Sequence, residues 1–111
     1  MKTYDDFIER FGPGNCNVIY CELGKVVITS DHIRITTDFK SDVYNLSRLD
    51  GPVYINKEID ENGKNITEWW VNSFHVTDEI TQWAKDNDID LDNLSEDDKL
   101  LIKIVWSDYG K

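Results

Sequence analysis

The sequence contains few cysteines, no long apolar run and few cations, and each of these shortages excludes a class of protein. Only 2 of the 111 residues are cysteine, which is too few for the disulfide framework of a small secreted domain. In one strand Cys16 and Cys21 would point to opposite faces, and two cysteines alone cannot complete a zinc site. We interpret both as small buried side chains.

The sequence pattern does not indicate membrane insertion or secretion. No apolar run approaches the roughly 20 residues that a membrane-spanning helix needs. Residues 1–6 lack the basic and then apolar pattern of a secretory signal. We therefore expect a cytoplasmic protein that makes no contact with a membrane.

Carboxylates outnumber cations, and the imbalance is concentrated in one segment. There are 12 Lys and Arg against 22 Asp and Glu, a formal net charge of −10. Residues 78–98 contain one base, Lys85, and nine acids: Asp78, Glu79, Asp86, Asp88, Asp90, Asp92, Glu96, Asp97 and Asp98. Direct binding of nucleic acid through its phosphates is therefore disfavoured, whereas a cationic protein surface would be attracted.

The apolar residues, 40% of the chain, are enough for one hydrophobic core. No repeat or linker divides residues 1–111, so we predict a single domain. A helix is predicted over residues 3–11, with Thr3 as its cap and Gly12 at its end. Its apolar residues recur at helical spacing: Tyr4, Phe7, Ile8 and Phe11.

Alternating apolar residues predict an antiparallel sheet. A first hairpin is expected from residues 18–23 and 26–29 around a Gly24-Lys25 turn, followed by a strand over residues 32–39. A second hairpin is predicted at Asn62-Gly63, the dipeptide preferred in type I′ turns. The expected register pairs Glu61 with Lys64, Ile59 with Ile66, Lys57 with Glu68, and Ile55 with Trp70.

Beyond this hairpin, a helix is expected to begin at Thr77, followed by the acidic segment and a last strand over residues 99–106. The β-branched content of residues 99–106 favours a strand over a helix. The predicted fold class is α+β, a mostly antiparallel sheet of about five to six strands with two helices packed on one face.

No motif for catalysis or cofactor binding is present. Phosphate-binding glycine loops and the G-x-S-x-G nucleophile motif are missing, and His32 and His75 lack metal-ligand spacing. We predict a protein that is not an enzyme and that binds no cofactor.

One stretch partly matches a calcium-binding loop. Asp86, Asp88, Asp90, Asp92 and Asp97 occupy EF-hand ligand positions. Leu91 replaces the glycine of that loop, Asn93 its aliphatic residue, and Asp97 its bidentate glutamate. We predict no specific metal site and leave weak calcium binding open.

The two consecutive tryptophans must face opposite sides of a strand. Trp70 shares a face with Ile66 and Phe74 and is predicted to lie in the core. Trp69 on the other face could be exposed, where it would serve as an anchor for a binding partner, although a covering helix or loop is an equal alternative.

The acidic segment has two interpretations. It is either a solvated surface that keeps the protein soluble, or a recognition surface whose carboxylates imitate the phosphate rows of nucleic acid. In an extended segment Asp86, Asp88, Asp90 and Asp92 would form such a row, continued by Glu96, Asp97 and Asp98.

The opening Met1-Lys2-Thr3-Tyr4-Asp5-Asp6-Phe7-Ile8 resembles the start of many small early proteins of large tailed bacteriophages. The small size, acidity and lack of a catalytic motif are similar to phage-encoded inhibitors of host defence. Some of these inhibitors are DNA mimics that block restriction or CRISPR nucleases. Bacterial immunity proteins share the composition. The resemblance covers eight residues and the composition, and it transfers no functional residue. It implies a protein that acts in the bacterial cytoplasm.

The leading expectation is a non-enzymatic inhibitor of a basic nucleic-acid-handling protein, such as a nuclease or a host-defence effector. The predicted binding residues are Glu79, Asp86, Asp88, Asp90, Asp92, Glu96, Asp97, Asp98 and Trp69. The alternative is a structural or scaffolding module that is acidic only for solubility. A homodimer is left open.

Overall fold

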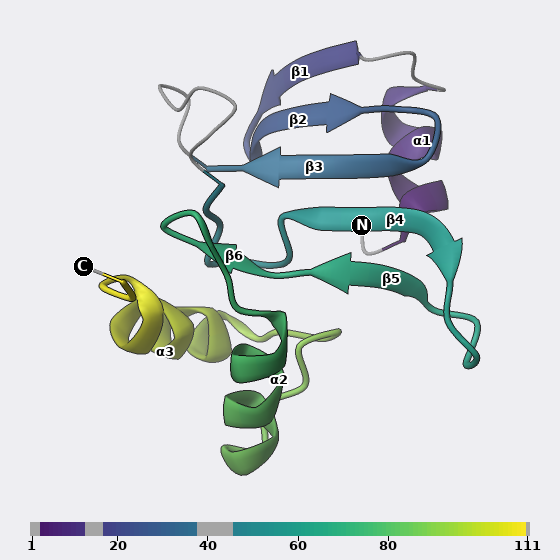
Figure 1. Ribbon diagram of the computed structural model, residues 1–111. Coiled ribbons are helices and arrows are strands. Elements are labelled where there is room, and N and C mark those ends of the chain that lie inside the picture. The colour runs from purple at the N-terminus through teal and green to yellow at the C-terminus, as the bar shows by residue number, and fades with distance from the viewer. Residues whose placement is uncertain (1–2, 13–16, 38–45, 111) are drawn as a thin grey trace.

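The computed structural model describes residues 3–12, 17–37 and 46–110, and Figure 1 shows the arrangement of its elements. Helix α1 (Tyr4–Phe11) precedes strands β1 (Asn17–Cys21), β2 (Gly24–Ile28), β3 (His32–Thr36), β4 (Tyr54–Ile59) and β5 (Asn65–Glu68). Short strands β6 (Trp70–Val71) and β7 (Phe74–His75) lead into helices α2 (Thr77–Asp86) and α3 (Glu96–Trp106). Strands β1 to β5 form an antiparallel sheet in chain order, and β6 pairs with β7.

The predicted α+β class with a mostly antiparallel sheet is confirmed. The described residues form three helices, however, where two were predicted. Helix α1 lies next to β1–β4, whereas α2 and α3 lie beyond β5 (Figure 1). That the helices share one face of the sheet stays a prediction. No helix in the described ranges is long and apolar enough to cross a membrane.

Helix α1 forms where the sequence predicts it and covers the first hydrophobic core. Thr3 Oγ1 accepts a hydrogen bond from Asp6 N (3.1 Å), and the Asp6 carboxylate accepts one from Thr3 N (3.1 Å), which completes a capping box. Gly12 ends the helix with a φ of 87°. The buried residues of this core are Tyr4, Phe7, Val26, Ile28, Ile33, Ile35 and Ile55.

Strand β3 shows the predicted alternation over residues 32–35, since Ile33 and Ile35 are buried while His32 and Arg34 are partly exposed. The alternation ends there, because Thr36 is also buried and Thr37 is exposed. The sheet therefore has a covered face, on which the first core lies, and an open face. Cys21 packs against the first core from the covered face. Cys16 and Phe39, two other residues of the sequence predictions, lie outside the described residues.

The first hairpin turns two residues earlier than predicted. Cys21 pairs with Gly24, so Glu22 and Leu23 form the turn, and the prediction of a Gly24-Lys25 turn is wrong. Gly24 is instead required by the neighbouring strand. Its φ is 113°, and a Cβ there would lie 2.2 Å from the Thr36 carbonyl oxygen. The pairing shifts by an even number of residues, so the predicted covered face is retained.

The second hairpin differs from the predicted type I′ turn. Asp60 N donates to Lys64 O (2.7 Å) around a three-residue loop in which Gly63 has a φ of 78°. The Asp60 carboxylate fixes this loop by accepting hydrogen bonds from Asn62 N (2.8 Å) and Lys64 N (3.1 Å). This local side-chain bonding, together with an irregularity between Ile55 and Ile59, overrides the predicted register.

The new register exchanges the two tryptophans. Ile55 pairs with Thr67 instead of Trp70, so Thr67 joins the covered face. Trp69 follows it there and is only 3% exposed, whereas Trp70 is half-buried on the open face. The interpretation of Trp69 as an exposed anchor is therefore wrong and the alternative of a covered Trp69 is confirmed, whereas the prediction of Trp70 as a core residue is wrong.

Residues 99–106 belong to a helix, which corrects the predicted last strand. Ser95 and Asp98 form a capping box that starts α3: Ser95 Oγ accepts from Asp98 N (3.1 Å), and the Asp98 carboxylate accepts from Ser95 N (3.1 Å). Ile102 and Trp106, four positions apart, are its buried residues. The cap and this spacing outweigh the β-branched content.

Helix α2 begins at Thr77 as predicted, but Thr77 is not its cap. The N-cap is Val76, whose apolar side chain cannot accept a hydrogen bond from the helix end. Thr77 Oγ1 instead accepts a hydrogen bond from Trp69 N (2.8 Å). Both C-terminal helices pack on a second core formed by Trp69, Val71, Val76, Ile80, Ile102 and Trp106.

Candidate protein-binding surface

The predicted acidic residues lie on α2, on the turn that follows it and on the first turn of α3. We call this set the acidic surface: Asp78, Glu79, Asp86, Asp88, Asp90, Asp92, Glu96, Asp97 and Asp98. Each is exposed except Asp98, which is half-buried because its carboxylate caps α3. Buried Ile80 and Ala84 fix α2, and buried Ile102 fixes α3. Six of these carboxylates are therefore carried by ordered helices, and Asp88, Asp90 and Asp92 lie on the turn between them.

Four side chains of the acidic surface make no hydrogen bond or ion pair with any residue in the described ranges. They are Asp78, Glu79, Asp88 and Asp97. The other carboxylates have local partners. Asp92 pairs with Lys64 (2.8 Å), Glu96 with Lys99 (3.4 Å), and Asp86 accepts from Gln82 Nε2 (2.9 Å). A large share of the negative charge is thus available to a partner.

Lys64 contributes a contact that the sequence did not predict. It was expected to pair with Glu61 across the hairpin, but it reaches Asp92. The hydrogen bond to Asp92 is the main reason that the pKa of Lys64 is raised, followed by the charge of Asp92 and the charges of Asp90 and Asp60. No local sequence signal could reveal a pair that is 28 positions apart.

The carboxylates do not form the alternating row that an extended segment would give. Asp86 ends α2, Asp88 has a positive φ of 54°, and Asp90 accepts a hydrogen bond from Asp92 N (3.0 Å) in a tight turn. The EF-hand-like positions are likewise not gathered. Nowhere in the described ranges do three or more His, Cys, Asp or Glu residues lie close enough to hold a metal ion.

Apolar side chains of α3, and not Trp69, are exposed and could serve as anchors for a binding partner. Helix α3 begins with the acidic residues 96–98, and further along it exposes large apolar residues: Leu100, Leu101, Ile104 and Val105. Ile104 is 70% exposed. This surface was not predicted, because the β-branched content of residues 99–106 favours a strand over a helix. Apolar residues next to charged ones are typical of protein interfaces.

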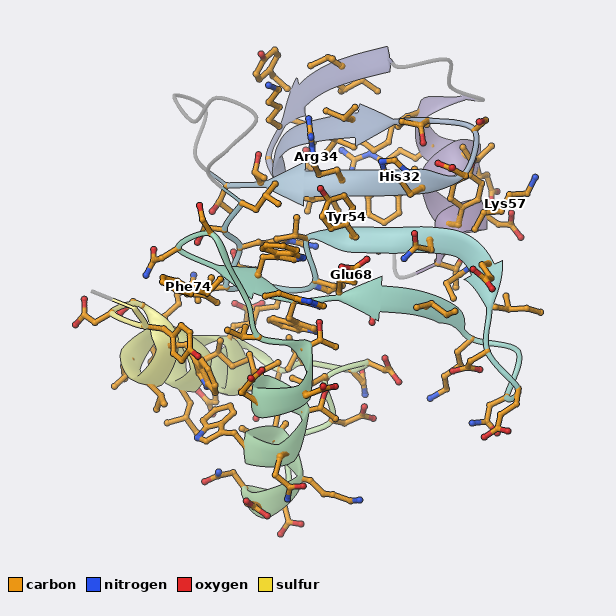
Figure 2. All side chains as sticks on the ribbon, in the orientation of Figure 1. His32, Arg34, Tyr54, Lys57, Glu68 and Phe74 are labelled. Atoms are coloured by element: carbon orange, nitrogen blue, oxygen red, sulfur yellow. The ribbon has the colours of Figure 1, made fainter. Side chains whose placement is uncertain are left out.

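The open face of the sheet carries a series of aromatic side chains. His32, Arg34, Tyr54 and Glu68 project from adjacent strands (Figure 2). The ring centroids of Tyr54 lie 5.6 Å from His32 and 6.4 Å from Trp70. Trp70 stacks on His75 at 4.9 Å. The corrected register assembles this series, because it moves Trp70 to the open face.

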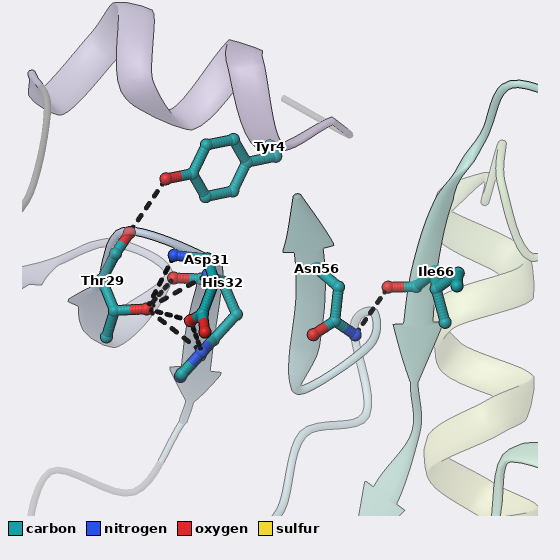
Figure 3. A network of polar contacts seen from close by, with 6 residues as sticks. All are labelled: Tyr4, Thr29, Asp31, His32, Asn56 and Ile66. Carbon is teal, nitrogen blue, oxygen red and sulfur yellow. Dashed lines mark hydrogen bonds and ion pairs between the residues drawn. The ribbon is translucent and has the colours of Figure 1, made fainter. Parts of the chain in front are cut away.

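The two histidines lie in structural hydrogen-bond networks. In the turn before β3, His32 Nδ1 lies 2.6 Å from Asp31 Oδ1 and 3.1 Å from Thr29 Oγ1 (Figure 3). Both contacts involve the same ring nitrogen, whereas a catalytic relay uses one nitrogen for the carboxylate and the other for the nucleophile. His75 Nε2 lies 2.7 Å from Thr77 Oγ1. Thr29 also fixes the turn by accepting from His32 N (3.1 Å).

No family model matches the chain, and no curated protein or solved structure matches it in the comparisons. Its function is therefore argued from the surfaces described above.

Proposed function

We propose that this protein is a non-enzymatic inhibitor that covers a basic, nucleic-acid-binding surface of another protein with its acidic surface. The observation that carries the proposal is a group of exposed carboxylates without partners in the described ranges: Asp78 and Glu79 on α2, Asp88 in the turn that follows it, and Asp97 on α3. Residues 78–98 contain nine acids and a single base. A surface of this charge is repelled by nucleic acid and attracted to the cationic sites with which other proteins bind nucleic acid.

The fixed conformation of the two helices supports a role in recognition. A carboxylate on a capped, packed helix has less freedom to lose on binding than one on a loose tail. Asp97 lies in the first turn of α3, two residues after the Ser95 cap, and Glu79 lies on α2 next to buried Ile80. The inhibitor would therefore present these charges in a fixed arrangement. Matching a partner of fixed shape requires such an arrangement.

The exposed apolar side of α3 supports a protein as the partner. Nucleic acid presents phosphates to a protein, and Leu100 and Ile104 offer them nothing. A basic protein can pack its own apolar side chains there while its cations meet residues 96–98. The proposed partner is thus a nuclease or a host-defence effector, bound through charge and apolar contact together.

The test uses two variants with equal loss of charge. The first carries Asp78→Asn, Glu79→Gln, Asp88→Asn and Asp97→Asn, which removes the unpartnered carboxylates. The control carries Glu9→Gln, Glu58→Gln, Glu61→Gln and Asp108→Asn, which are exposed residues elsewhere. Each protein captures partners from nuclease-treated bacterial lysate at low and high salt, with mass spectrometry as the readout.

A basic nucleic-acid enzyme is expected on the unchanged protein and on the control, with release as salt rises. Exposed ion pairs contribute about 0.2–1 kcal/mol each, so the loss of four should weaken binding of the purified partner about fourfold to about 900-fold. The affinity of the first variant should also depend less on salt. Equal affinity and equal salt dependence of both variants would refute the role of the acidic surface.

A scaffolding role is the second candidate, and the apolar side of α3 favours it as well. In that case α3 would pack on a second copy of the chain. Light scattering then gives a stable oligomer, which Ile104→Asp returns to the monomer, and the lysate yields no basic partner. A monomer at all concentrations rules out this second role.

A further inference from the structure

A cavity of about 630 Å³ lies between the covered face of the sheet and α2, at the boundary of the two hydrophobic cores. Ile55 of the first core, Trp69 of the second and Ala84 of α2 all line it, and it is open to solvent. Its volume falls within the range of small-molecule sites. Neither the acidic surface nor the open face explains why it is there.

Arg48 lines this cavity together with Gly51 and Pro52. The side chain is only 8% exposed, and its guanidinium packs against Gly51 so closely that a Cβ there would lie 2.9 Å from it. Nη1 donates to Pro52 O (2.8 Å), but Nε makes no hydrogen bond to any residue of the described ranges. A buried donor without a partner is costly, and Nε is itself too enclosed to meet a ligand, so the guanidinium can be reached only through its Nη atoms.

Among the described residues, the charge of Arg48 is only partly compensated. Burial lowers the pKa of its guanidinium to about 10, and nearby Asp50 opposes this change only in part. The Asp50 carboxylate forms an ion pair with Lys103 (3.0 Å), which takes up part of its charge. A carboxylate or phosphate placed at Arg48 would complete the pairing.

The walls of the cavity combine hydroxyl groups with apolar side chains. Thr77 and Thr81, one turn apart, present the same side of α2, and Thr67 faces them from β5. Thr77 Oγ1 already accepts from Trp69 N, and Thr81 Oγ1 donates to Thr77 O (2.6 Å). The Thr67 hydroxyl makes no hydrogen bond within the described ranges. A few polar groups among apolar walls are typical of a ligand site.

The charged residues at the cavity restrict the charge of a ligand. Asp50, Asp90 and Asp92 line it, as do Lys85 and Lys99, and Asp92 is also paired with Lys64. These three carboxylates balance the charges of Arg48, Lys85 and Lys99, so the cavity has no net positive charge to hold a ligand with several phosphates. A ligand with a single negative group and an apolar body can instead satisfy Arg48.

We propose that this cavity binds a small carboxylate with an apolar body, whose carboxylate accepts hydrogen bonds from Arg48 while its apolar part packs on Ile55 and Trp69. The cavity shares Asp90 and Asp92 with the acidic surface, but the four residues substituted in the test of the inhibitor function do not line it. Loss of one does not imply loss of the other.

The test titrates the full-length protein with octanoate and with octylammonium, which differ chiefly in the sign of their charge. Binding is followed by NMR through the Trp69 indole and the amides of Thr67 and Thr81. Octanoate is expected to shift these signals to saturation with a Kd in the millimolar range or below, as suits a ligand of its size. Octylammonium is expected to leave them unchanged.

Two variants then test Arg48 itself. Arg48→Gln should weaken octanoate binding about tenfold or more, because a charge-assisted hydrogen bond is lost. Arg34→Gln removes the same charge from the open face and should change the affinity less than about twofold. If Arg48→Gln does not fold, the comparison of the two probes on the unchanged protein decides.

The proposal is overturned by shifts with octylammonium equal to those with octanoate, by the lack of a saturable shift of the Trp69 indole, or by an Arg48→Gln variant that binds octanoate as tightly as the unchanged protein. Shifts confined to Leu100 and Ile104 would show that octanoate only covers the exposed apolar side of α3 and would refute the cavity site.

Discussion

Gly24→Ala is expected to be among the most damaging of the single substitutions to alanine in the sheet. The φ of Gly24 is 113°, a backbone conformation that costs a residue with a Cβ about 1–2 kcal/mol. In addition, the new Cβ would lie 2.2 Å from the Thr36 carbonyl oxygen, about 1 Å inside the closest normal contact. β3 must then withdraw, which weakens the pairing of Lys25 with Thr36.

The magnitude follows from these two effects. Overpacking that displaces backbone costs about 1–3 kcal/mol, and alanine returns about 0.4–1 kcal/mol by restricting the unfolded chain. We expect a net loss of about 2–4 kcal/mol for Gly24→Ala, a large fraction of the about 5–15 kcal/mol that stabilises a typical domain. Urea unfolding followed by tryptophan fluorescence measures it.

Gly63→Ala is the matched control. Gly63 also has a positive φ, 78°, but a Cβ there meets nothing within 4 Å. Only the backbone cost remains, so we expect a loss of about 1 kcal/mol or less. Equal losses at Gly24 and Gly63 would show that the close approach of β2 to β3 is wrong, and with it the corrected first hairpin.

Three further predictions concern α3 and the His32 turn. Ile102→Ala should cost about 2–5 kcal/mol of unfolding free energy and Ile104→Ala less than about 0.5 kcal/mol, since only Ile102 is buried. Similar losses for the two variants would contradict helix α3 and favour the strand predicted over residues 99–106. Ser95→Ala should cost about 1 kcal/mol and lower the helix signal in circular dichroism, whereas an unchanged spectrum and stability would contradict the cap. The pKa of Asp31 is lowered, first by the hydrogen bond from Thr29 and then by His32, so its stabilisation is present above the unfolded pKa and disappears as pH falls through the lower folded pKa. Asp31→Asn should therefore flatten the acid branch of the stability curve measured by urea unfolding, and an unchanged branch would contradict the network.

The prediction of helix α1, its cap and the alternation of β3 from sequence succeeded because these features depend on neighbours within one or two turns of chain. Thr3 meets Asp6 three positions away, and Ile33 and Ile35 alternate with polar residues wherever a strand is half-buried. The α+β class and the acidic character of residues 78–98 follow from the same local information.

The tertiary structure decided which face of the sheet each tryptophan occupies. A shift of the strand pairing by an odd number of residues exchanges the two faces, and the Asp60 side chain produced such a shift by fixing a three-residue loop. Trp69 therefore became a wall of the cavity and Trp70 part of the open face. The composition of the chain is the same in either register.

The sequence by itself determined that this protein is acidic and where along the chain the charge lies. Only the tertiary structure decided that Asp92 meets Lys64, that Arg48 is buried beside a cavity, and that α3 exposes an apolar side. The physical reason is that these features depend on contacts between residues far apart in the chain. Local propensity and periodicity report only on residues within a turn or a strand of one another.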